Sequence, residues 1–251
     1  MISDTLVSVQ HLRKDYYDSL GRVVTACRDL TFEAHAGEVF GLLGTNGAGK
    51  TTALRMLSTV LKPTAGDAHI AGHSVLGEPD AVRKSIGFLS ADTGVYGRLT
   101  AREMMEYFGR LNGLSEARIA QQVKDIAAAL DMESFLTRRC DKLSSGQKQR
   151  VNIARTIMHD PPVLIFDEPT SGLDILASAQ IVRFIRESRE RGRCVIFSTH
   201  VMREAEKLCD RLVILHQGQV CIAGTLAEVR DLVGKEDLEE VFLEAIGETR
   251  L

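Results

Sequence analysis

Short apolar runs separated by polar turns fill the first part of the chain, before the apolar period becomes helical. Their length and β-prone composition predict strands. The predicted strands are residues 6–9, 23–26, 31–34 and 38–43. The last run ends in glycines, and apolar residues at helical spacing follow over residues 51–61, until Pro63 and Gly66 predict a stop and a turn. The pattern therefore predicts a strand, a glycine-rich loop and a helix in direct succession.

From residue 99 to residue 159 the apolar positions recur at helical spacing throughout, which predicts a helical insert. Strand character returns at residues 163–166 and 194–198, with a helix predicted between them at residues 177–189. Two buried strands joined by a helix are typical of a parallel sheet with helices on its faces. The remaining predicted elements are a short helix after His200, a strand at 212–215, a hairpin at Gln217-Gly218, and helices near 226–232 and 238–246.

The composition is that of an ordinary globular protein, with 44% hydrophobic and 26% charged residues among 251. This length fits one large domain, or one domain with an inserted subdomain. A formal net charge of −3 excludes the basic surface of a general nucleic-acid binder, so we expect no nucleic-acid partner.

Cysteine usage and hydropathy favour a cytoplasmic protein. The five cysteines contain no CxxC pair and are odd in number, which argues against a disulfide framework and against a zinc site. The longest apolar runs are too short to span a bilayer, and residues 1–10 lack the pattern of a secretory signal. If the protein serves a membrane, we expect it to do so through a partner.

Residues 44–51 match the phosphate-binding pattern GxxxxGK[ST] between an apolar strand and a helix. The glycines allow backbone N–H groups to close around phosphates, and the positive end of the helix favours the anion. Lys50 supplies a mobile cation and Thr51 an oxygen ligand for magnesium. A glycine-rich turn that merely caps a helix is the weaker alternative, because every fixed position matches in the required context. The nucleotide-binding candidates are Gly44, Thr45, Asn46, Gly47, Ala48, Gly49, Lys50, Thr51 and Thr52.

Two acidic residues, Asp167 and Glu168, follow the apolar run 163–166. Ligands of open α/β sheets bind at the carboxyl ends of the strands. Asp167 is therefore a candidate for holding Mg²⁺, mostly through water, and Glu168 for orienting or deprotonating the attacking water. A solvated strand end is the alternative, and the phosphate loop upstream favours the catalytic interpretation.

The segment Leu143-Ser-Ser-Gly-Gln147 points to a family when it is taken together with the two motifs above. By itself Ser-Ser-Gly is a good helix cap. Between a phosphate loop and an acid pair, it resembles the LSGGQ signature of the ABC ATPases, and the resemblance covers nearly the whole chain. The resemblance implies that these signature residues contact the ATP bound by a partner chain: Ser144, Ser145, Gly146 and Gln147.

Three further residues take roles only through this resemblance. Asp174, in Ser-Gly-Leu-Asp, is similar to the D-loop aspartate, and His200 is similar to the switch histidine that contacts the γ-phosphate. Outside this family, a lone histidine at a strand end is more often a packed or hydrogen-bonded structural group. Tyr16 resembles the aromatic residue that stacks on adenine; the adjacent Tyr17 competes for this role, and an exposed strand-end tyrosine is the alternative.

The sequence departs from the family pattern at two positions. Ser145 replaces the first glycine of the signature pair, so the backbone there must tolerate a Cβ. Counting back from residues 99–103, which resemble the segment after the Q-loop, places Ala91 at the position of the usual glutamine, with Asp92 next. Either Asp92 takes over part of the glutamine's role, or the metal is held without a side chain from this loop.

The resemblance implies an α/β fold, namely an ABC-type P-loop nucleotide-binding domain. Its expected parts are a RecA-like parallel core, an antiparallel β portion and a helical subdomain that carries the signature. In this chain they correspond to a nucleotide-binding core at 1–92 and 160–234, a helical signature subdomain at 93–159, and a C-terminal helical segment at 235–251.

The implied activity is Mg-dependent hydrolysis of ATP to ADP and phosphate, coupled to transport. Glu168 and His200 would be catalytic, and Thr51 and Asp167 would hold the metal. The expected partners are a second nucleotide-binding chain, identical or similar, in a head-to-tail dimer, and integral membrane permease subunits. Those permease subunits would keep this cytoplasmic protein at the inner face of the cell membrane.

Three local motifs narrow the resemblance to one group of ABC ATPases. Ile86-Gly-Phe-Leu, Tyr96-Gly-Arg-Leu-Thr and Leu238-Glu-Glu-Val-Phe-Leu resemble the ABC-2 type ATPases, which mostly power export and include sodium-extrusion subunits.

A soluble ABC ATPase of DNA repair or translation usually has two cassettes, long coiled coils or a zinc hook, and this sequence displays one cassette and no such features. A GTPase would carry an Asn-Lys-x-Asp element, and a kinase would not explain residues 143–147.

Overall fold

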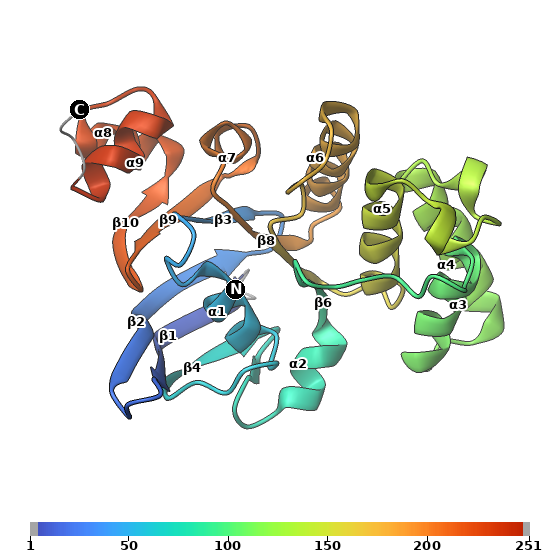
Figure 1. The fold of residues 1–251 in the computed structure, drawn as a ribbon, viewed down its shortest axis with the longest axis horizontal. Coiled ribbons are helices and arrows are strands. Elements are labelled where there is room, and N and C mark those ends of the chain that lie inside the picture. Colours follow the sequence, from blue (N-terminus) through green and yellow to red (C-terminus); the bar gives the residue numbers. More distant parts are fainter. Residues whose placement is uncertain (1–4, 248–251) are drawn as a thin grey trace.

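Six strands form the central sheet of the protein, whose residues 5–247 are described by a computed structural model (Figure 1). Their order is β10, β9, β3, β8, β7, β6, and all neighbours are parallel except the β9–β10 hairpin. Residues 1–4 and 248–251 of the predicted domain ranges lie outside the described residues. The strands are β3 (Val39–Leu43), β6 (Ile86–Leu89), β7 (Val163–Asp167), β8 (Cys194–Thr199), β9 (Arg211–His216) and β10 (Gln219–Thr225).

Strands β3, β7 and β8 are buried along their whole length, as their uninterrupted apolar sequences predict. Because these strands are parallel, their carboxyl ends meet at one edge of the sheet. The chain continues there into the phosphate loop after β3, into Glu168 after β7 and into His200 after β8. Motifs that lie far apart in the sequence are therefore brought to one edge.

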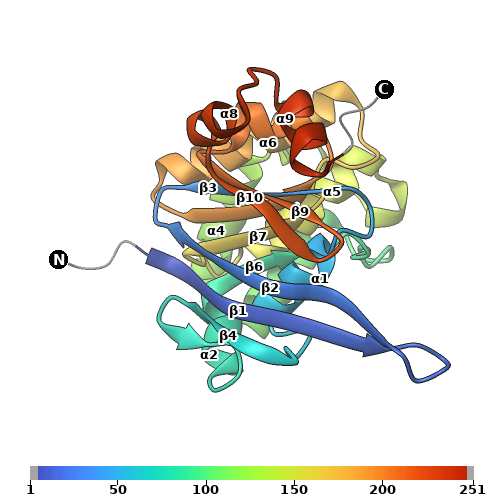
Figure 2. The ribbon, with the colours of Figure 1, turned by 90° about the vertical axis from the view of Figure 1, so that its left-hand side faces the viewer.

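A second, antiparallel sheet has the strand order β2, β1, β4, β5. Figure 2 shows β1, β2 and β4 on one side of the central sheet, with α8 (Leu226–Val233) and α9 (Leu238–Ala245) on the other. The strands of this second sheet are β1 (Thr5–Tyr17), β2 (Val23–His35), β4 (Ala65–Ile70) and β5 (His73–Ser74).

The prediction of two strands at residues 23–26 and 31–34 is wrong, because both runs belong to the single strand β2. The residues between them continue to pair with β1. Shifts of register in this pairing absorb the break in the apolar alternation, and His11, with a φ of 52°, lies at one of them.

Helix α1 (Lys50–Leu57) packs between the two sheets, with Leu54 in the same buried cluster as Leu12 of β1 and Leu42 of β3. It ends before residue 61, the predicted end, because Thr59 adopts a left-handed φ of 61°. The other helices are α2 (Pro79–Ser85), α3 (Ala101–Leu111), α4 (Glu116–Ala129), α5 (Ser145–Thr156), α6 (Ile175–Glu190) and α7 (Met202–Leu208), with 3-10 turns at Glu133–Phe135 and Cys140–Lys142.

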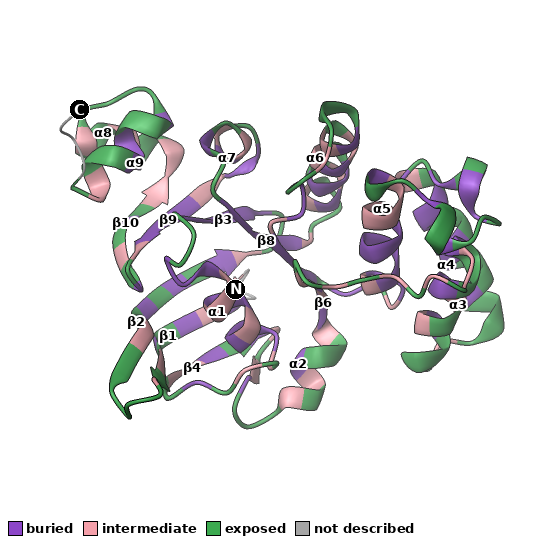
Figure 3. Cartoon of the chain, viewed as in Figure 1, coloured by how far each residue is buried: buried purple, intermediate pink, exposed green. Residues whose placement is uncertain are grey.

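Helices α3, α4 and α5 form a group at one end of the molecule, beyond β6 (Figure 1). Their apolar residues share a core with the central sheet, since Ile153 belongs to the same buried cluster as Leu164 and Phe166 of β7. Figure 3 shows buried positions on these helices as well as on the central strands. The alternate residues Val163 and Ile165 belong to the cluster that the four-stranded sheet covers. None of the helices within residues 5–247 is both long and apolar enough to cross a bilayer.

Candidate nucleotide-binding and catalytic site

The loop between β3 and α1 encloses a cavity of about 150 Å³, lined by residues 46–52 together with Ala26 and Glu168. The first turn of α1 begins at Lys50, so its free N–H groups and positive end lie at this loop. Gly49 has a φ of 108°, and a Cβ there would lie 2.4 Å from the carbonyl oxygen of Ala26. This position therefore requires glycine, and the loop is shaped to take an anion.

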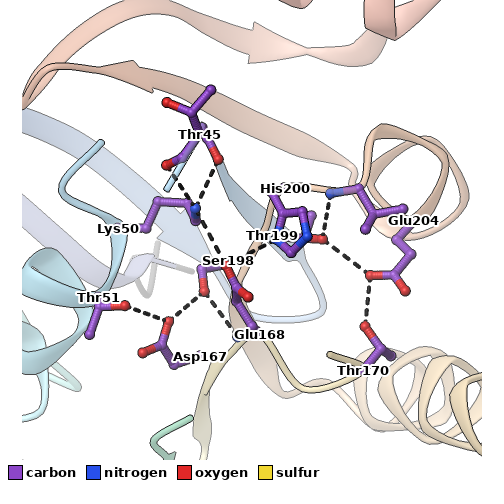
Figure 4. A network of polar contacts seen from close by, with 12 residues as sticks. Thr45, Lys50, Thr51, Asp167, Glu168, Thr170, Ser198, Thr199, His200 and Glu204 are labelled. Atoms are coloured by element: carbon purple, nitrogen blue, oxygen red, sulfur yellow. Dashed lines mark hydrogen bonds and ion pairs between the residues drawn. The ribbon is translucent and has the colours of Figure 1, made fainter. Parts of the chain in front are cut away.

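The side chain of Lys50 is hydrogen-bonded to the backbone of the phosphate loop. Its Nζ donates hydrogen bonds to the carbonyl oxygens of Gly44 at 2.8 Å and of Thr45 at 3.2 Å. The same Nζ lies 3.5 Å from Oε1 of Glu168, and the lysine side chain is only 5% exposed (Figure 4). The cation is thus positioned between the loop and the catalytic candidate.

Asp167 has one satisfied and one unsatisfied carboxylate oxygen. Its Oδ1 accepts hydrogen bonds from Oγ1 of Thr51 at 3.1 Å and from Oγ of Ser198 at 2.7 Å. Its Oδ2 is buried without any hydrogen-bond partner. A buried charged oxygen without a partner is costly unless a ligand satisfies it, and carboxylate and hydroxyl oxygens suit Mg²⁺. Thr51 and Asp167 therefore fit the proposed metal.

The part of the chain described here contains no cluster of three or more His, Cys, Asp or Glu side chains that could enclose a metal. A cation at Asp167 would thus need further oxygen ligands from phosphates and water. This is how magnesium is usually bound in nucleotide sites.

Glu168 follows Asp167 in a strained backbone conformation, with a φ of 47°. Its backbone N–H donates to Oγ of Ser198 at 3.0 Å, and its Oε1 lies 3.1 Å from Nδ1 of His200. Strand β8 and the residue after it thus hold Glu168, and His200, which is 45% exposed, lies beside the carboxylate (Figure 4).

The signature residues begin α5. Ser144 caps this helix: its Oγ accepts the N–H of Gln147 at 3.3 Å, and its own N–H donates to Oε1 of Gln147 at 3.1 Å. Ser145 is the first residue of the helix and has no positive φ, so the backbone accommodates its Cβ. Within residues 5–247, no hydrogen bond joins residues 144–147 to the phosphate loop, and they do not line its cavity.

Helix packing explains why residue 146 is a glycine. A Cβ built on it would lie 2.6 Å from the Cβ of Ala177, in the first turn of α6. The glycine therefore allows α5 and α6 to approach closely. Its role in packing is separate from any contact with a partner's nucleotide.

Gly146→Ala is expected to lower the free energy of unfolding by about 1–3 kcal/mol, the usual cost of overpacking. Adding Ala177→Gly removes the clashing methyl and should recover part of the loss. Urea denaturation of the two single variants and the double variant measures this coupling. Additive effects would show that the two positions do not clash.

Asp174 and Tyr16 lie in positions that leave their predicted roles open. Asp174 caps α6, with its Oδ1 accepting the N–H of Ala177 at 2.9 Å. Tyr16 is 41% exposed near the end of β1, with Nζ of Lys14 5.4 Å from its ring centroid. Neither Tyr16 nor the more exposed Tyr17 lines the phosphate cavity.

The side chain of Asp92 contacts Arg55 and not the phosphate site. It is 82% exposed, and its Oδ2 pairs at 2.6 Å with the guanidinium of Arg55, on the side of α1 beyond the loop. Ala91 is exposed, and neither residue lines the cavity. The aspartate is thus used in a surface ion pair.

Asp92→Ala is therefore expected to reduce ATP turnover only modestly, by about tenfold or less, the scale of one auxiliary interaction. Arg55→Ala, which removes the same ion pair from the other side, is the matched control and should give a similar change. Steady-state phosphate release measures both. A loss as large as that of Asp167→Ala would mean that Asp92 replaces the missing glutamine.

Ser198 is a site residue that the sequence motifs did not single out. It is fully buried and contacts both Asp167 and the backbone of Glu168. Its position follows from the pairing of β7 with β8, in which Asp167 lies opposite Ser198. A polar residue at the end of the apolar run 194–198 was the available signal.

Cys27 forms a hydrogen bond with the phosphate loop. It is 2% exposed, and its Sγ donates to the carbonyl oxygen of Gly49 at 3.5 Å. Burial raises the pKa of this thiol to about 12, so it stays protonated at neutral pH.

Comparison with known proteins shows which family the chain belongs to. The profile of the ABC transporter family matches residues 27–171. The chain is 40% identical over 223 residues to the ABC transporter ATP-binding protein NatA of Bacillus subtilis, covering 88% of this chain and 91% of that protein. It is 33% identical over 244 residues to a daunorubicin resistance ATP-binding protein of Streptomyces coeruleorubidus, covering 97% and 76% of the two chains.

Solved structures give the same result. An ATP-binding subunit of an ABC transporter superposes with a TM-score of 0.85 at 30% identity, covering 96% of this chain and 99% of that one. A dimeric, post-hydrolysis ATP-binding cassette bound to ADP and phosphate superposes with a TM-score of 0.78 at 25% identity, covering 87% and 98%. The chain belongs to the ABC transporter family, in which it is an ATP-binding and ATP-hydrolysing subunit.

Proposed function

We propose that this chain hydrolyses Mg-ATP to drive export through a separate membrane-embedded partner. The observation that carries the chemistry is the meeting of Lys50, Asp167, Glu168 and His200 beside the phosphate cavity, at one edge of the central sheet. Relatives named for Nod factor export and daunorubicin resistance support the direction of transport.

Each residue at this edge has a role in the proposed reaction. Lys50 and the N–H groups of residues 44–52 bind the phosphates, and Glu168 orients the attacking water and takes up its proton. His200 holds Glu168 and reaches the γ-phosphate. Thr51 and Asp167 would hold Mg²⁺, which would supply positive charge to the bound phosphates.

Adenine is proposed to stack on Tyr16. Tyr16 pairs with Val24 across the β1–β2 ladder, and Ala26, two residues further along β2, lines the phosphate cavity. Tyr16, which is 41% exposed, and the phosphate cavity thus lie along the same pair of strands, and an aromatic ring can support a base.

The complete site is proposed to need two chains. Residues 144–147 of one chain would cover the γ-phosphate bound by residues 44–52 of the other, with Asp174 at the same interface. The exposed position of Ser144 and the dimeric cassette among the structural relatives support this arrangement. The second chain is an identical or a similar subunit.

The membrane partner is proposed to dock near residues 96–103, between the core and the helices α3–α5. Tyr96 is 51% exposed and Tyr107 46%, and with Phe108 they form an aromatic cluster with ring centroids 5.4–6.3 Å apart. The carbonyl of Gly97 accepts the N–H of Asp141, three residues before Ser144. Movement of this segment would thus reach the signature.

We further propose that the protein acts at the cytoplasmic face of the cell membrane. The proposed division of the chain is a nucleotide-binding core at 1–92 and 160–234, a signature subdomain at 93–159 and a C-terminal helical segment at 235–251. Copurification with the membrane partner, followed by measurement of which solutes stimulate ATP hydrolysis, tests the whole proposal. A chain that copurifies with no membrane protein would instead favour a non-transport ABC ATPase.

The docking surface has its own test. Tyr96→Cys and Arg102→Cys, in a chain whose exposed Cys221 is replaced by serine, should crosslink to the membrane partner. Leu232→Cys, on the exposed face of α8 and 76% exposed, is the matched control and should not. Crosslinks from Leu232→Cys alone would contradict the proposed surface.

A further inference from the structure

The carboxylate of Glu204 joins the two loops that carry the proposed catalytic pair. Its Oε2 accepts hydrogen bonds from Oγ1 of Thr170 at 2.8 Å and from Oγ1 of Thr199 at 3.2 Å (Figure 4). Thr170 follows Glu168 by two residues, and Thr199 directly precedes His200. A single oxygen atom on α7 thus connects the loop after β7 with the loop after β8.

Both threonine hydroxyls donate their proton to Glu204 and have little access to water. Thr170 is 9% exposed and Thr199 3% exposed, so water offers little alternative to either hydroxyl. Each hydroxyl has one proton to donate, and each donates it to Glu204. The Oγ1 of Thr199 also accepts the N–H of Val201, which fixes the backbone on the far side of His200.

The same loop is tied to the signature helix. Nε2 of Gln149, on α5, donates to the carbonyl oxygen of Pro169 at 2.7 Å. The segment after Glu168 therefore has one attachment on α5 and one on α7. Because Glu168 itself has a strained backbone with a φ of 47°, its position depends on the contacts that surround it.

We propose that Glu204 is a positioning residue for ATP hydrolysis, which holds the Glu168 loop against the His200 loop without contacting the nucleotide. This inference rests on the roles proposed above for Glu168 and His200. Glu204 forms no ion pair with any residue in the described range 5–247 and receives only hydroxyl donors there. An uncharged acceptor of the same shape should therefore serve equally well.

The test compares Glu204→Ala with Glu204→Gln in steady-state Mg-ATP hydrolysis. Glu204→Ala should lower kcat by about 10- to 100-fold, the cost of misplacing a catalytic group by about 1 Å, and leave KM within about twofold. Glu204→Gln keeps the acceptor oxygen and should stay within about threefold of the wild-type kcat. Lys207→Ala, an exposed change on the same helix, is the control.

Three outcomes would overturn the proposal. They are a wild-type kcat for Glu204→Ala, a Glu204→Gln variant as slow as Glu204→Ala, or a change confined to KM. Should Glu204→Ala fail to fold, Thr170→Val removes one of the two contacts isosterically and must itself lower kcat. Glu168→Gln is assayed in parallel: if it remains fully active, the proposed catalytic role fails, whereas an inactive Glu168→Gln beside an active Glu204→Ala contradicts the positioning role alone.

Discussion

Glu168→Gln is expected to bind ATP, to lose hydrolysis, and to accumulate as an ATP-bound dimer. The amide keeps the shape of the side chain but cannot accept a proton from water, and loss of a general base commonly costs about 10²- to 10⁴-fold in rate. Lys50 and Thr51 are unchanged, so the nucleotide stays bound. Size-exclusion chromatography with and without ATP, together with phosphate release, measures both effects.

A second substitution separates the dimer from the chemistry. Ser144→Arg, added to Glu168→Gln, should return the protein to a monomer, because it places a bulky cation where the partner's γ-phosphate is proposed to lie. Ser115→Arg is the matched control, since Ser115 is an exposed cap of α4 in the same group of helices and lies outside the proposed interface.

The outcomes of this experiment are distinct. A wild-type rate for Glu168→Gln would overturn the catalytic assignment. A Glu168→Gln protein that stays monomeric with ATP bound, alone and together with its membrane partner, would contradict the composite site. Loss of the dimer with Ser115→Arg would point to a general effect of an altered helix cap.

Lys50→Ala is expected to abolish tight nucleotide binding. It removes the buried cation aimed at the phosphates, and charge-assisted hydrogen bonds of this kind contribute about 1.5–3 kcal/mol each, so two of them correspond to a loss of about 10²-fold or more in affinity. It also removes the lysine donor from the carbonyl oxygens of Gly44 and Thr45, of which Thr45 keeps the N–H of Ala48.

Titration of the folded variant with a fluorescent ATP analogue measures the affinity. Lys124→Ala, an exposed lysine of α4, controls for the general loss of a positive charge. An unchanged affinity in Lys50→Ala would rule out the proposed function of this loop.

The parts of the fold that the sequence predicts well are those in which local pattern and burial agree. The strands at residues 163–166 and 194–198 are continuous apolar runs, and both form buried parallel strands. The hairpin at Gln217-Gly218 also forms, with positive φ at both residues. In these segments the local sequence carries nearly all of the information.

Other elements depend on partners distant in the sequence. Strand β2 cannot be recognised from its own interrupted alternation, because pairing with β1 supplies its continuity. Helix α2 is short and has one buried residue, Val82, so it presents no apolar period. The pattern therefore predicts only the two ends of β2 and gives no signal for α2.

The candidate site divides in the same way. Lys50, Asp167 and Glu168 lie in contiguous motifs and are predicted from the sequence. In contrast, Ser198 contacts Glu168 across 30 residues, and Glu204 contacts Thr170 across 34. Their polar side chains look unremarkable in a linear sequence. Only the parallel register of β7 and β8, and the packing of α7 beside them, give these side chains their partners.

The left-handed backbone at Glu168 has a consequence for evolution and engineering. A residue other than glycine at a φ of 47° costs about 1–3 kcal/mol of folding free energy in general. Replacement by glycine would relieve this strain and remove the carboxylate that lies 3.5 Å from Nζ of Lys50. A selection for stability without an activity screen would therefore not protect the proposed catalytic carboxylate at this position.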